Sequence, residues 1–218
     1  MDKLTIPKPT LRRLPFYLNY LKALPKETRT ISATAIAEAL GQGEVQVRKD
    51  LSAASASGGR PKMGYTVSTL IADLEDALGC NDPKHAVLVG VGRLGGALLS
   101  FTAFARYGMY ITAAFDNDPA KIGTTIGGTE IMDIARLGEV CRAQDIHIGI
   151  LTTSPGPAQQ LARQMTDAGI LAIWNFSTAH LEVPEGIIVY DEDLAVSLAM
   201  ISRALDAKLE AEAAQTTT

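Results

Sequence analysis

A glycine-rich string, Gly90-Val91-Gly92-Arg93-Leu94-Gly95, carries the most specific chemistry in the 218-residue sequence. It follows an apolar run that predicts a strand, and it opens a stretch with helical spacing. In such a turn the first glycine permits the tight bend, the second lets the backbone approach a pyrophosphate, and the third allows close packing of helix on strand. We therefore expect a dinucleotide-binding site at residues 90–95.

An acidic residue lies at the position where a dinucleotide-binding site needs a carboxylate to bind the adenosine ribose. Asp116 ends the next predicted strand, 21 residues after Gly95. A carboxylate at this place can accept hydrogen bonds from both ribose hydroxyls. Its charge would repel a 2′-phosphate, so NAD is expected in preference to NADP.

A second set of candidate binding residues lies near the N-terminus. Ser32 is a suitable N-cap for a short helix over 33–40, Gly41 ends it, and a second helix is predicted over 44–54. Two short helices joined by a glycine-containing turn are typical of a helix-turn-helix. The second helix carries side chains that can reach phosphates or base edges in a major groove: Gln46, Arg48, Lys49 and Ser52.

The distribution of charge favours a polyanionic partner for this part of the chain. Residues 53–62 contain a glycine pair and a proline and end in the cations Arg60 and Lys62, so a basic wing is expected after the second helix. Residues 1–62 hold 11 Lys and Arg against 5 Asp and Glu, whereas the remainder holds 9 against 19. This asymmetry indicates nucleic-acid binding by the N-terminal segment.

Other elements must hold these two sets of residues in place. An amphipathic helix is predicted to begin around Pro15, and another covers 67–78. Beyond a junction at 81–84, buried strands are expected to alternate with helices, which is the pattern of a doubly wound parallel sheet. The strands are predicted over 86–91, 110–115, 146–151 and 170–174, and the helices over 94–107 and 157–168.

The expected fold class is therefore α/β, with three parts. An N-terminal winged helix-turn-helix domain occupies 1–80, a C-terminal Rossmann domain with a doubly wound parallel sheet occupies 84–192, and a C-terminal helix occupies 193–211. The composition, 47% apolar and 20% charged, is typical of soluble globular proteins. With no apolar run near the roughly 18 residues of a membrane span and no signal core, no membrane partner and a cytoplasmic location are expected.

The sequence shows no set of catalytic residues. A dehydrogenase built on this domain needs a second domain that supplies substrate contacts and an acid or base, and nothing after Asp193 provides one. Two cysteines 61 positions apart exclude a disulfide framework and a cysteine-based zinc module, so no metal is expected. A cofactor site joined to a DNA-binding domain indicates a sensor of the cofactor with no enzymatic activity.

Several strings in fixed order connect the sequence to a known family. They are QVRKDLS at 46–52, GY at 64–65, GVGRLG at 90–95, FDNDPAKIG at 115–123, ILT at 150–152 and NF at 175–176. With these strings the chain resembles the Rex family of redox-sensing transcriptional repressors from about residue 6 to 205. The resemblance implies a homodimer that binds palindromic operator DNA in the apo or NAD⁺ form and is released by NADH.

The resemblance also implies roles for particular residues. Arg48, Lys49 and Ser52 fall on the DNA-contacting helix, and Asp193 matches an acidic position at the start of the terminal helix. That helix, with Leu194, Leu198 and Leu205, looks like the segment that family dimers exchange. The residues expected to bind NAD⁺/NADH are Gly90, Val91, Gly92, Arg93, Leu94, Gly95, Asp116, Lys121, Ile122, Thr152, Asn175 and Phe176.

The chain departs from the family pattern in two places. After Ser52 the family usually has Tyr-Phe-Gly and a further aromatic residue, whereas here residues 53–63 read AASASGGRPKM, so the aromatic packing that anchors the wing is lost. A usual Val-Pro-Ala is replaced by Thr153-Ser154-Pro155, and Asn-Phe-Ala-Pro is replaced by NFST at 175–178. The second change predicts a more polar nicotinamide pocket.

Two other functions stay open at this point. A small NAD-dependent oxidoreductase with a helical N-terminal appendage predicts turnover of a substrate and no salt-dependent DNA binding. A nucleotide-binding module of the CoA-binding type, with a non-functional DNA-binding domain, would share the glycine string but would not need Asp116 on a ribose.

Overall fold

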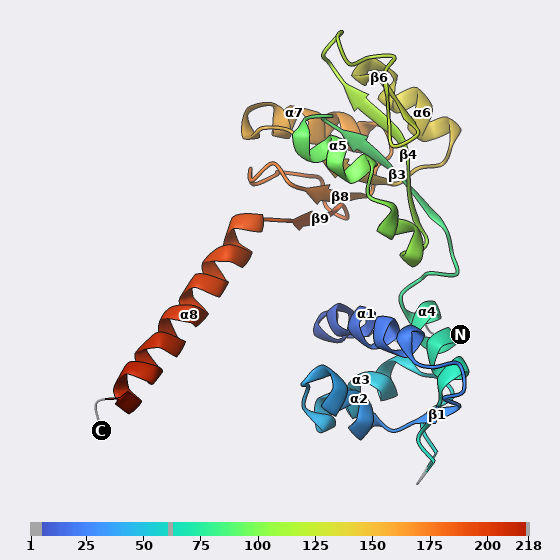
Figure 1. Cartoon of the computed structure of the whole chain (residues 1–218). Helices are drawn as coiled ribbons and strands as arrows, with labels where there is room; N and C mark the ends of the chain where they lie inside the picture. Colours follow the sequence, from blue (N-terminus) through green and yellow to red (C-terminus); the bar gives the residue numbers. More distant parts are fainter. Residues whose placement is uncertain (1–5, 61–62, 217–218) are drawn as a thin grey trace. The chain divides into compact units, whose positions relative to one another are not determined.

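The structure is a computed structural model that describes residues 6–60 and 63–216 (Figure 1). The chain forms two compact units. The first unit contains the described residues up to Pro83 together with Ala103–Met109, and the second contains Lys84–Thr102 and the described residues from Tyr110 onward.

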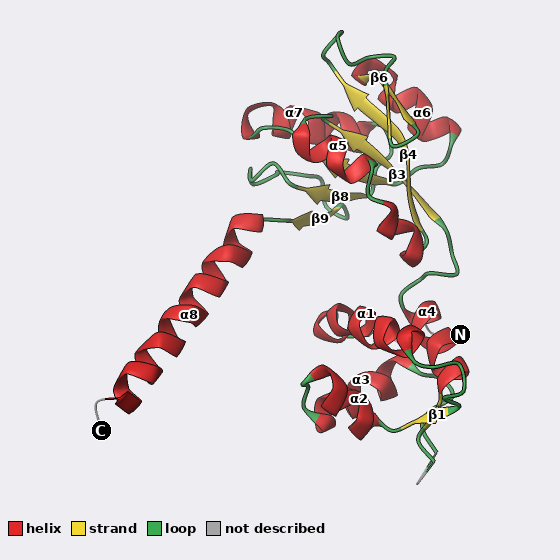
Figure 2. Cartoon of the chain, in the orientation of Figure 1, coloured by secondary structure: helices red, strands yellow, loops and turns green. Residues whose placement is uncertain are grey.

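The first unit is a small helical domain with a two-stranded antiparallel sheet (Figure 2). Strands β1 and β2 pair antiparallel, with Ile31 opposite Tyr65. Ser32 Oγ accepts the Ala35 N–H (3.0 Å), and Gly41 ends the next helix in the left-handed conformation, as predicted. The winged helix-turn-helix prediction is confirmed. The elements are α1 (Lys8–Ala23), β1 (Thr30–Ile31), α2 (Ala33–Leu40), α3 (Glu44–Ala54), β2 (Tyr65–Thr66) and α4 (Val67–Ala77).

The predicted start of the first helix at Pro15 is wrong, because α1 begins at Lys8 and Pro15 lies inside it. Pro9 occupies the first turn, where a missing N–H costs nothing. Pro15 removes one hydrogen bond from the helix interior, yet the buried stripe from Thr10 to Leu21 continues across it. Burial of this stripe outweighs the local preference of proline.

A buried carboxylate joins α1 to α3 within the first unit. Asp50 has no solvent exposure. Arg13 donates two hydrogen bonds to it, from Nε (2.6 Å) and Nη2 (2.8 Å), and Tyr17 Oη donates another (2.8 Å). Thr10 Oγ1 and Gln46 Nε2 complete the set, each at 2.9 Å. Burial raises the pKa of Asp50, but these hydrogen bonds, led by Arg13, outweigh it and bring the pKa to about 2.

The second unit is built on a seven-stranded sheet of order β5-β6-β4-β3-β7-β8-β9. The pairs β4/β6, β3/β7, β7/β8 and β8/β9 are parallel, and β5/β6 is antiparallel. Without β5, this is the Rossmann order 3-2-1-4-5-6, so the doubly wound prediction is confirmed. The strands are β3 (Lys84–Val89), β4 (Met109–Asp116), β5 (Thr125–Ile126), β6 (Thr129–Asp133), β7 (Ile148–Leu151), β8 (Ala172–Asn175) and β9 (Ile188–Asp191).

Helices cover both faces of this sheet. Val87 and Val89 of β3 pack in a cluster with α6 and α7, whereas Ala86 and Leu88 belong to a second cluster that includes Leu99 of α5. Alternate residues of one strand are thus buried on opposite faces, which explains its continuous apolar run. The remaining elements are α5 (Arg93–Leu99), η1 (Thr102–Tyr107), η2 (Ile134–Arg136), α6 (Leu137–Ala143), α7 (Pro155–Asp167) and α8 (Leu194–Thr216).

The helix predicted over 94–107 is wrong in length, because α5 ends at Leu99 and a 3-10 helix follows. The turn between β5 and β6 lies against this end: a Cβ on Gly127 would come within 2.2 Å of the Leu99 carbonyl oxygen. A contact from residues almost thirty positions later therefore adjoins the point where α5 stops. The elements β5, β6, β9 and α6 were not predicted from the sequence.

Within residues 6–60 and 63–216, no helix combines the length and the hydrophobicity needed to cross a membrane.

Removal of the Asp50 carboxylate should destabilise the first unit. In Asp50→Ala the Arg13 guanidinium and two hydroxyls lose their acceptor, so the free energy of unfolding should fall by about 3 kcal/mol. The measurement is urea unfolding of the full chain followed by circular dichroism at 222 nm. Fluorescence of Trp174, the single tryptophan, follows the second unit separately.

Asp76→Ala, on the exposed side of α4, is the matched control and should change neither transition. Because the folded pKa of Asp50 is lowered from 3.8 to about 2, the wild-type advantage should be complete above pH 4 and disappear as pH falls towards 2. An Asp50→Ala transition equal to that of Asp76→Ala would contradict this role.

Candidate DNA interface and dinucleotide site

The outer face of α3 presents the polar side chains predicted to contact DNA. Arg48, Lys49 and Ser52 are exposed, and Arg48 forms an ion pair with Glu44 one turn earlier. Gln46 is exposed, but its amide nitrogen donates a hydrogen bond to Asp50. Its amide oxygen can still accept a hydrogen bond from another partner. DNA contact by these residues stays a prediction.

The two ends of the wing, Arg60 and Gly64, are hydrogen bonded to each other. The N–H of Arg60 donates to the Gly64 carbonyl (2.8 Å), and the N–H of Gly64 donates to the Arg60 carbonyl (3.0 Å). The Arg60 side chain is exposed, and Lys62 lies outside the described residues. Val45 on α3, 69% exposed, was missed by the sequence analysis, although an exposed aliphatic side chain on a recognition helix can contact a thymine methyl group.

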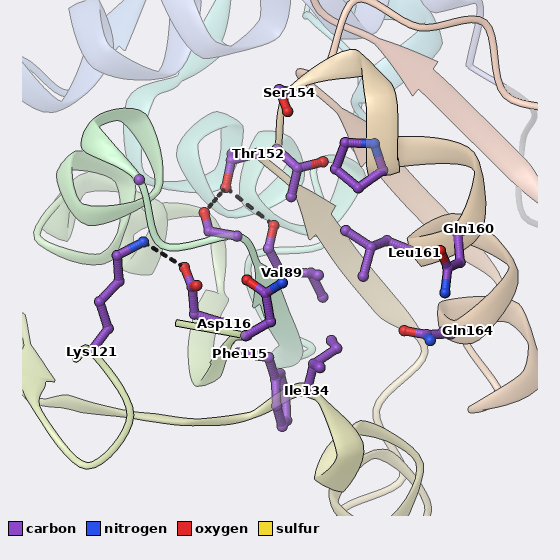
Figure 3. Close-up of a pocket in the computed structure, with 15 residues that line it drawn as sticks. Val89, Phe115, Asp116, Lys121, Ile134, Thr152, Ser154, Gln160, Leu161 and Gln164 are labelled. Carbon is purple, nitrogen blue, oxygen red and sulfur yellow. Dashed lines mark hydrogen bonds and ion pairs between the residues drawn. The ribbon is translucent and has the colours of Figure 1, made fainter. Parts of the chain in front are cut away.

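A cavity of about 390 Å³ lies in the second unit at the carboxyl ends of β3, β4 and β7. This is the point where the strand order reverses, the usual ligand site of doubly wound sheets. Figure 3 shows Asp116 and Lys121 on one side of the cavity and Gln160, Leu161 and Gln164 of α7 on the other. The predicted residues that line it are Gly90, Gly92, Asp116, Lys121 and Thr152.

The three glycines of the fingerprint differ in the space around them. Gly90 has φ of +95°, and a Cβ there would come within 2.4 Å of the Thr153 methyl group. A Cβ on Gly95 would lie 2.4 Å from the Gly90 carbonyl oxygen, so this glycine permits close packing of α5 on the turn. Gly92 faces open space, because a Cβ there would meet no other part of the described chain within 4 Å. Its backbone is therefore accessible to a phosphate-bearing ligand, which fits a dinucleotide.

Asp116 braces the glycine turn from the end of β4. Its Oδ2 accepts the Val91 N–H (2.8 Å) and Lys121 Nζ (3.0 Å), and its Oδ1 accepts the Asp118 N–H (2.9 Å). Burial raises the pKa of Asp116, but these donors together lower it below the ordinary value. The carboxylate is therefore ionised near neutral pH. A ribose contact by Asp116 stays a prediction, and it would have to share oxygens that already have donors.

Two adjacent threonines after β7 are used differently. Thr152 Oγ1 donates to the Gly90 carbonyl oxygen (2.6 Å) and so holds the turn (Figure 3). Thr153 Oγ1 is buried and has no hydrogen-bond partner among the described residues. An unsatisfied buried hydroxyl costs stability, so Thr153 is an unfavourable feature of the cavity wall.

Seven of the predicted cofactor residues do not line this cavity: Val91, Arg93, Leu94, Gly95, Ile122, Asn175 and Phe176. Asn175 is buried, and its amide donates to Asp191 Oδ1 (2.7 Å) and the Ala179 carbonyl (2.8 Å) while accepting from Ser177. These bonds occupy most of its hydrogen-bonding capacity. Phe176 packs against Trp174, with ring centroids 4.5 Å apart. Their contact with a nicotinamide stays a prediction.

The far wall of the cavity was missed by the sequence analysis. It comprises Pro157, Gln160, Leu161 and Gln164 of α7, and Ile134 of η2 also lines the cavity. The only available signal was the position of α7 directly after β7, since the helix that follows a strand at the switch point must border the ligand site.

The terminal helix α8 is apolar and exposed. Leu194, Leu198 and Leu205, expected in a dimer contact, have exposed fractions of 60%, 68% and 52%. Asp193 caps this helix, since its Oδ1 accepts the Ala195 N–H (2.9 Å). Within the described part of the chain, no three His, Cys, Asp or Glu side chains gather into a group that could hold a metal ion.

A winged helix and a Rossmann sheet with an open glycine turn define a class: DNA-binding proteins that carry a nucleotide-binding domain. Two known families match parts of the chain, "Putative DNA-binding protein N-terminus" over residues 5–52 and "CoA binding domain" over 81–179. The chain belongs to the Rex family of redox-sensing transcriptional repressors.

Two curated relatives carry the name "Redox-sensing transcriptional repressor Rex". The protein of Porphyromonas gingivalis is 41% identical over 197 residues, covering 90% of each chain, and that of Bacteroides fragilis is 40% identical over 206 residues, covering 94% of this chain and 93% of the relative. The crystal structure of RSP in complex with beta-NAD⁺ and operator DNA matches with a TM-score of 0.85 and 32% identity, covering 99% of this chain and 100% of RSP. RSP in complex with beta-NADH matches with a TM-score of 0.83 and 32% identity, covering 96% and 99%.

Gly92 and Gly95 should respond differently to an added methyl group. Gly95→Ala places a Cβ against the Gly90 carbonyl, so the second unit should lose about 2 kcal/mol of stability. Gly92→Ala meets no atom and should leave stability unchanged. Urea unfolding followed by Trp174 fluorescence measures both, and equal effects would contradict the described packing.

Thr153→Val should stabilise the second unit by about 1 kcal/mol, because a methyl group replaces a buried hydroxyl that lacks a partner. Thr152→Val is the matched control and should destabilise by a similar amount, since it removes the hydrogen bond to the Gly90 carbonyl. Thermal unfolding of the full-length variants measures the difference. A loss of stability in both would show that Thr153 has a partner.

Proposed function

We propose that this chain is a redox-sensing transcriptional repressor that binds palindromic operator DNA as a homodimer, in the apo or NAD⁺ form, and is released by NADH. The observation that carries the proposal is the match over 99% of the chain to RSP in complex with beta-NAD⁺ and operator DNA. The match to RSP with beta-NADH supports the second cofactor state. Such a repressor acts where the chromosome lies, which supports a cytoplasmic location.

The site residues divide between two functions under this proposal. Gln46, Arg48, Lys49 and Ser52 contact bases or phosphates, and Arg60 and Lys62 extend the contact through the wing. Gly90, Gly92 and Gly95 with Asp116, Lys121 and Thr152 hold the dinucleotide. The DNA-binding domain is assigned to 1–80, the NAD(H)-binding domain to 84–192 and the dimerisation helix to 193–211. No enzymatic reaction is assigned to the chain.

Dimerisation through α8 is supported by its exposed apolar side chains. Leu194, Leu198 and Leu205 lie in a helix of 23 residues and are all more than half exposed. A contiguous exposed apolar surface marks an interaction site. A second copy that covers it would also supply the second of the two recognition helices that a palindrome requires.

The chain can distinguish the two oxidation states only where they differ. Contacts from the glycine turn and Asp116 reach groups that NAD⁺ and NADH share, so they give affinity without discrimination. The nicotinamide ring carries a positive charge only in the oxidised state. Residues that bury the ring away from water favour the neutral reduced form, because desolvation of a charge costs free energy.

The switch also requires a sufficient difference in affinity. A ligand that inverts the populations of two conformations of the dimer from 1:99 to 99:1 must bind one of them more tightly by about 5.5 kcal/mol. We propose that burial of the reduced ring favours a closed dimer, whose recognition helices no longer match successive major grooves about 34 Å apart. The polar residues Thr153 and Ser154 reduce the bias that this chain can supply, so partial release is expected.

The test is titration of purified protein against a labelled pool of random duplex DNA, in a salt series, with NAD⁺ or NADH added. We expect binding that weakens steeply with salt and that is reduced, but not abolished, by NADH. Energy transfer from Trp174 to bound NADH measures the affinity for NADH on the same samples, and its loss when NAD⁺ displaces NADH measures the affinity for NAD⁺. Gly92→Ala should bind the same duplexes but need at least tenfold more NADH for release, because its Cβ blocks the phosphate approach.

Each other outcome identifies a different function. Equal affinity for NAD⁺ and NADH would contradict redox sensing. Substrate turnover without salt-dependent DNA binding would establish the oxidoreductase alternative, and competition by CoA but not by NADH would establish the CoA-binding alternative.

A further inference from the structure

The chain that leaves the recognition helix has almost no apolar side chain to hold it. We call residues 55–60, Ser-Ala-Ser-Gly-Gly-Arg, the wing arm. Helix α3 ends at Ala54, and Ser55 is the single buried residue of the wing arm. Two glycines and small side chains cost much conformational entropy to order, so something other than apolar burial must fix the wing arm.

A carboxylate on α4 supplies that restraint. Asp73 Oδ2 accepts a hydrogen bond from Ser55 Oγ (2.6 Å), another from Ser57 Oγ, and a third from the Ser57 N–H (3.4 Å). The Gly58 N–H donates in turn to Ser55 Oγ (3.2 Å). Four polar groups of the wing arm are thereby connected to Asp73 on α4, three of them directly and the Gly58 N–H through Ser55.

Asp73 lies on a helix that is anchored in the core of the first unit. Its neighbours on α4, Leu70 and Leu74, are almost completely buried in the first unit. The α4 backbone that carries the carboxylate is therefore anchored independently of the wing arm. Burial raises the pKa of Asp73, but the hydrogen bonds from the two serines outweigh it and keep the group ionised.

A second contact holds the distal half of the wing arm. A Cβ on Gly59 would lie 2.9 Å from Cζ of Tyr65, so the backbone of Gly59 packs directly on that ring. Tyr65 is buried and pairs with Ile31 in the two-stranded sheet. Between the Asp73 carboxylate and the Tyr65 ring, the path from α3 to the exposed cation Arg60 is defined.

The C-terminal cap of α3 does not account for this arrangement. The helix ends through the Ser55 N–H, which donates to the Leu51 carbonyl (2.8 Å) without Asp73. The Asp73 contacts begin with the side chain of Ser55 and continue into the wing arm. They therefore fix the direction of the wing arm and not the end of the helix.

We propose that Asp73 is a positioning residue for DNA binding, which orders the wing arm through Ser55 and Ser57 so that Arg60 is presented beside the recognition helix. The inference rests on the proposed function, because it assumes that α3 and Arg60 both contact DNA. An acidic group on a DNA-binding domain normally weakens binding to phosphates, so the direction of its effect is informative.

The test compares two matched variants of the full-length protein, Asp73→Ala and Asp76→Ala. Both remove one negative charge from α4, and alanine favours the helix in both cases. Asp76 is exposed, so general electrostatics predicts equal or tighter DNA binding for Asp76→Ala. For Asp73→Ala we expect about tenfold weaker binding to the tightest duplex that wild type selects, because the wing arm must then be ordered on binding.

Two further measurements separate positioning from a loss of folding. NADH affinity, measured by energy transfer from Trp174, should be unchanged in both variants. Amide hydrogen exchange over residues 55–60 should be faster in Asp73→Ala alone. Ser57→Ala should show part of the loss in DNA affinity, and adding it to Asp73→Ala should cause no further loss, since both remove the same contact.

The possible failures are distinguishable. If wild type selects no duplex at any salt concentration, the proposed function fails and the inference falls with it. If wild type selects a duplex but Asp73→Ala binds it as Asp76→Ala does, the positioning role is overturned while the proposed function stands. Unchanged exchange over residues 55–60 in Asp73→Ala would overturn the role without reference to DNA.

Discussion

The orientation of the recognition helix depends on the need to satisfy one buried charge. Asp50 lies on the inner side of α3, where an unpaired carboxylate would be prohibitively costly. Val47 and Leu51 attach the same helix to the core, but apolar packing is not directional. The hydrogen bonds from Arg13 and Tyr17 are directional, and both donors belong to α1. They fix the rotation of α3, and thereby which residues it turns outward.

The second unit uses a carboxylate in the same way, but with backbone donors. Asp116 holds the glycine turn through the Val91 N–H and its own loop through the Asp118 N–H. A ribose that bound to Asp116, as predicted, would therefore have to share this carboxylate with existing donors. Lys121 is the donor that can leave most easily, because its side chain is 37% exposed and can return to water. Its departure would leave the charge of Asp116 available to a neutral ribose and unfavourable for a 2′-phosphate.

Features specified by neighbouring residues could be predicted from the sequence, and features specified by distant contacts could not. The caps Ser32 and Gly41 act within one turn of their helix, so the bounds of α2 followed from local residue types. The glycine fingerprint is likewise contained in six residues. Pro15 misled the prediction of α1, because burial of a stripe spread over the whole helix overrides one proline.

The candidate site shows the same division. Gln160 and Gln164 resemble ordinary exposed helix residues in sequence, and only the packing of α7 beside the sheet brings them to the cavity. Asn175 matched a family string, yet its partners Ala179 and Asp191 become evident only once β8 and β9 are paired.

The order of the chain adds one constraint on any signal. Helix α5 begins at the glycine turn, ends at Leu99, and is followed within a few residues by Ala103–Met109, which groups with the first unit. A displacement of α5 by a ligand at its N-terminus therefore has a covalent path of only a few residues to the DNA-binding unit.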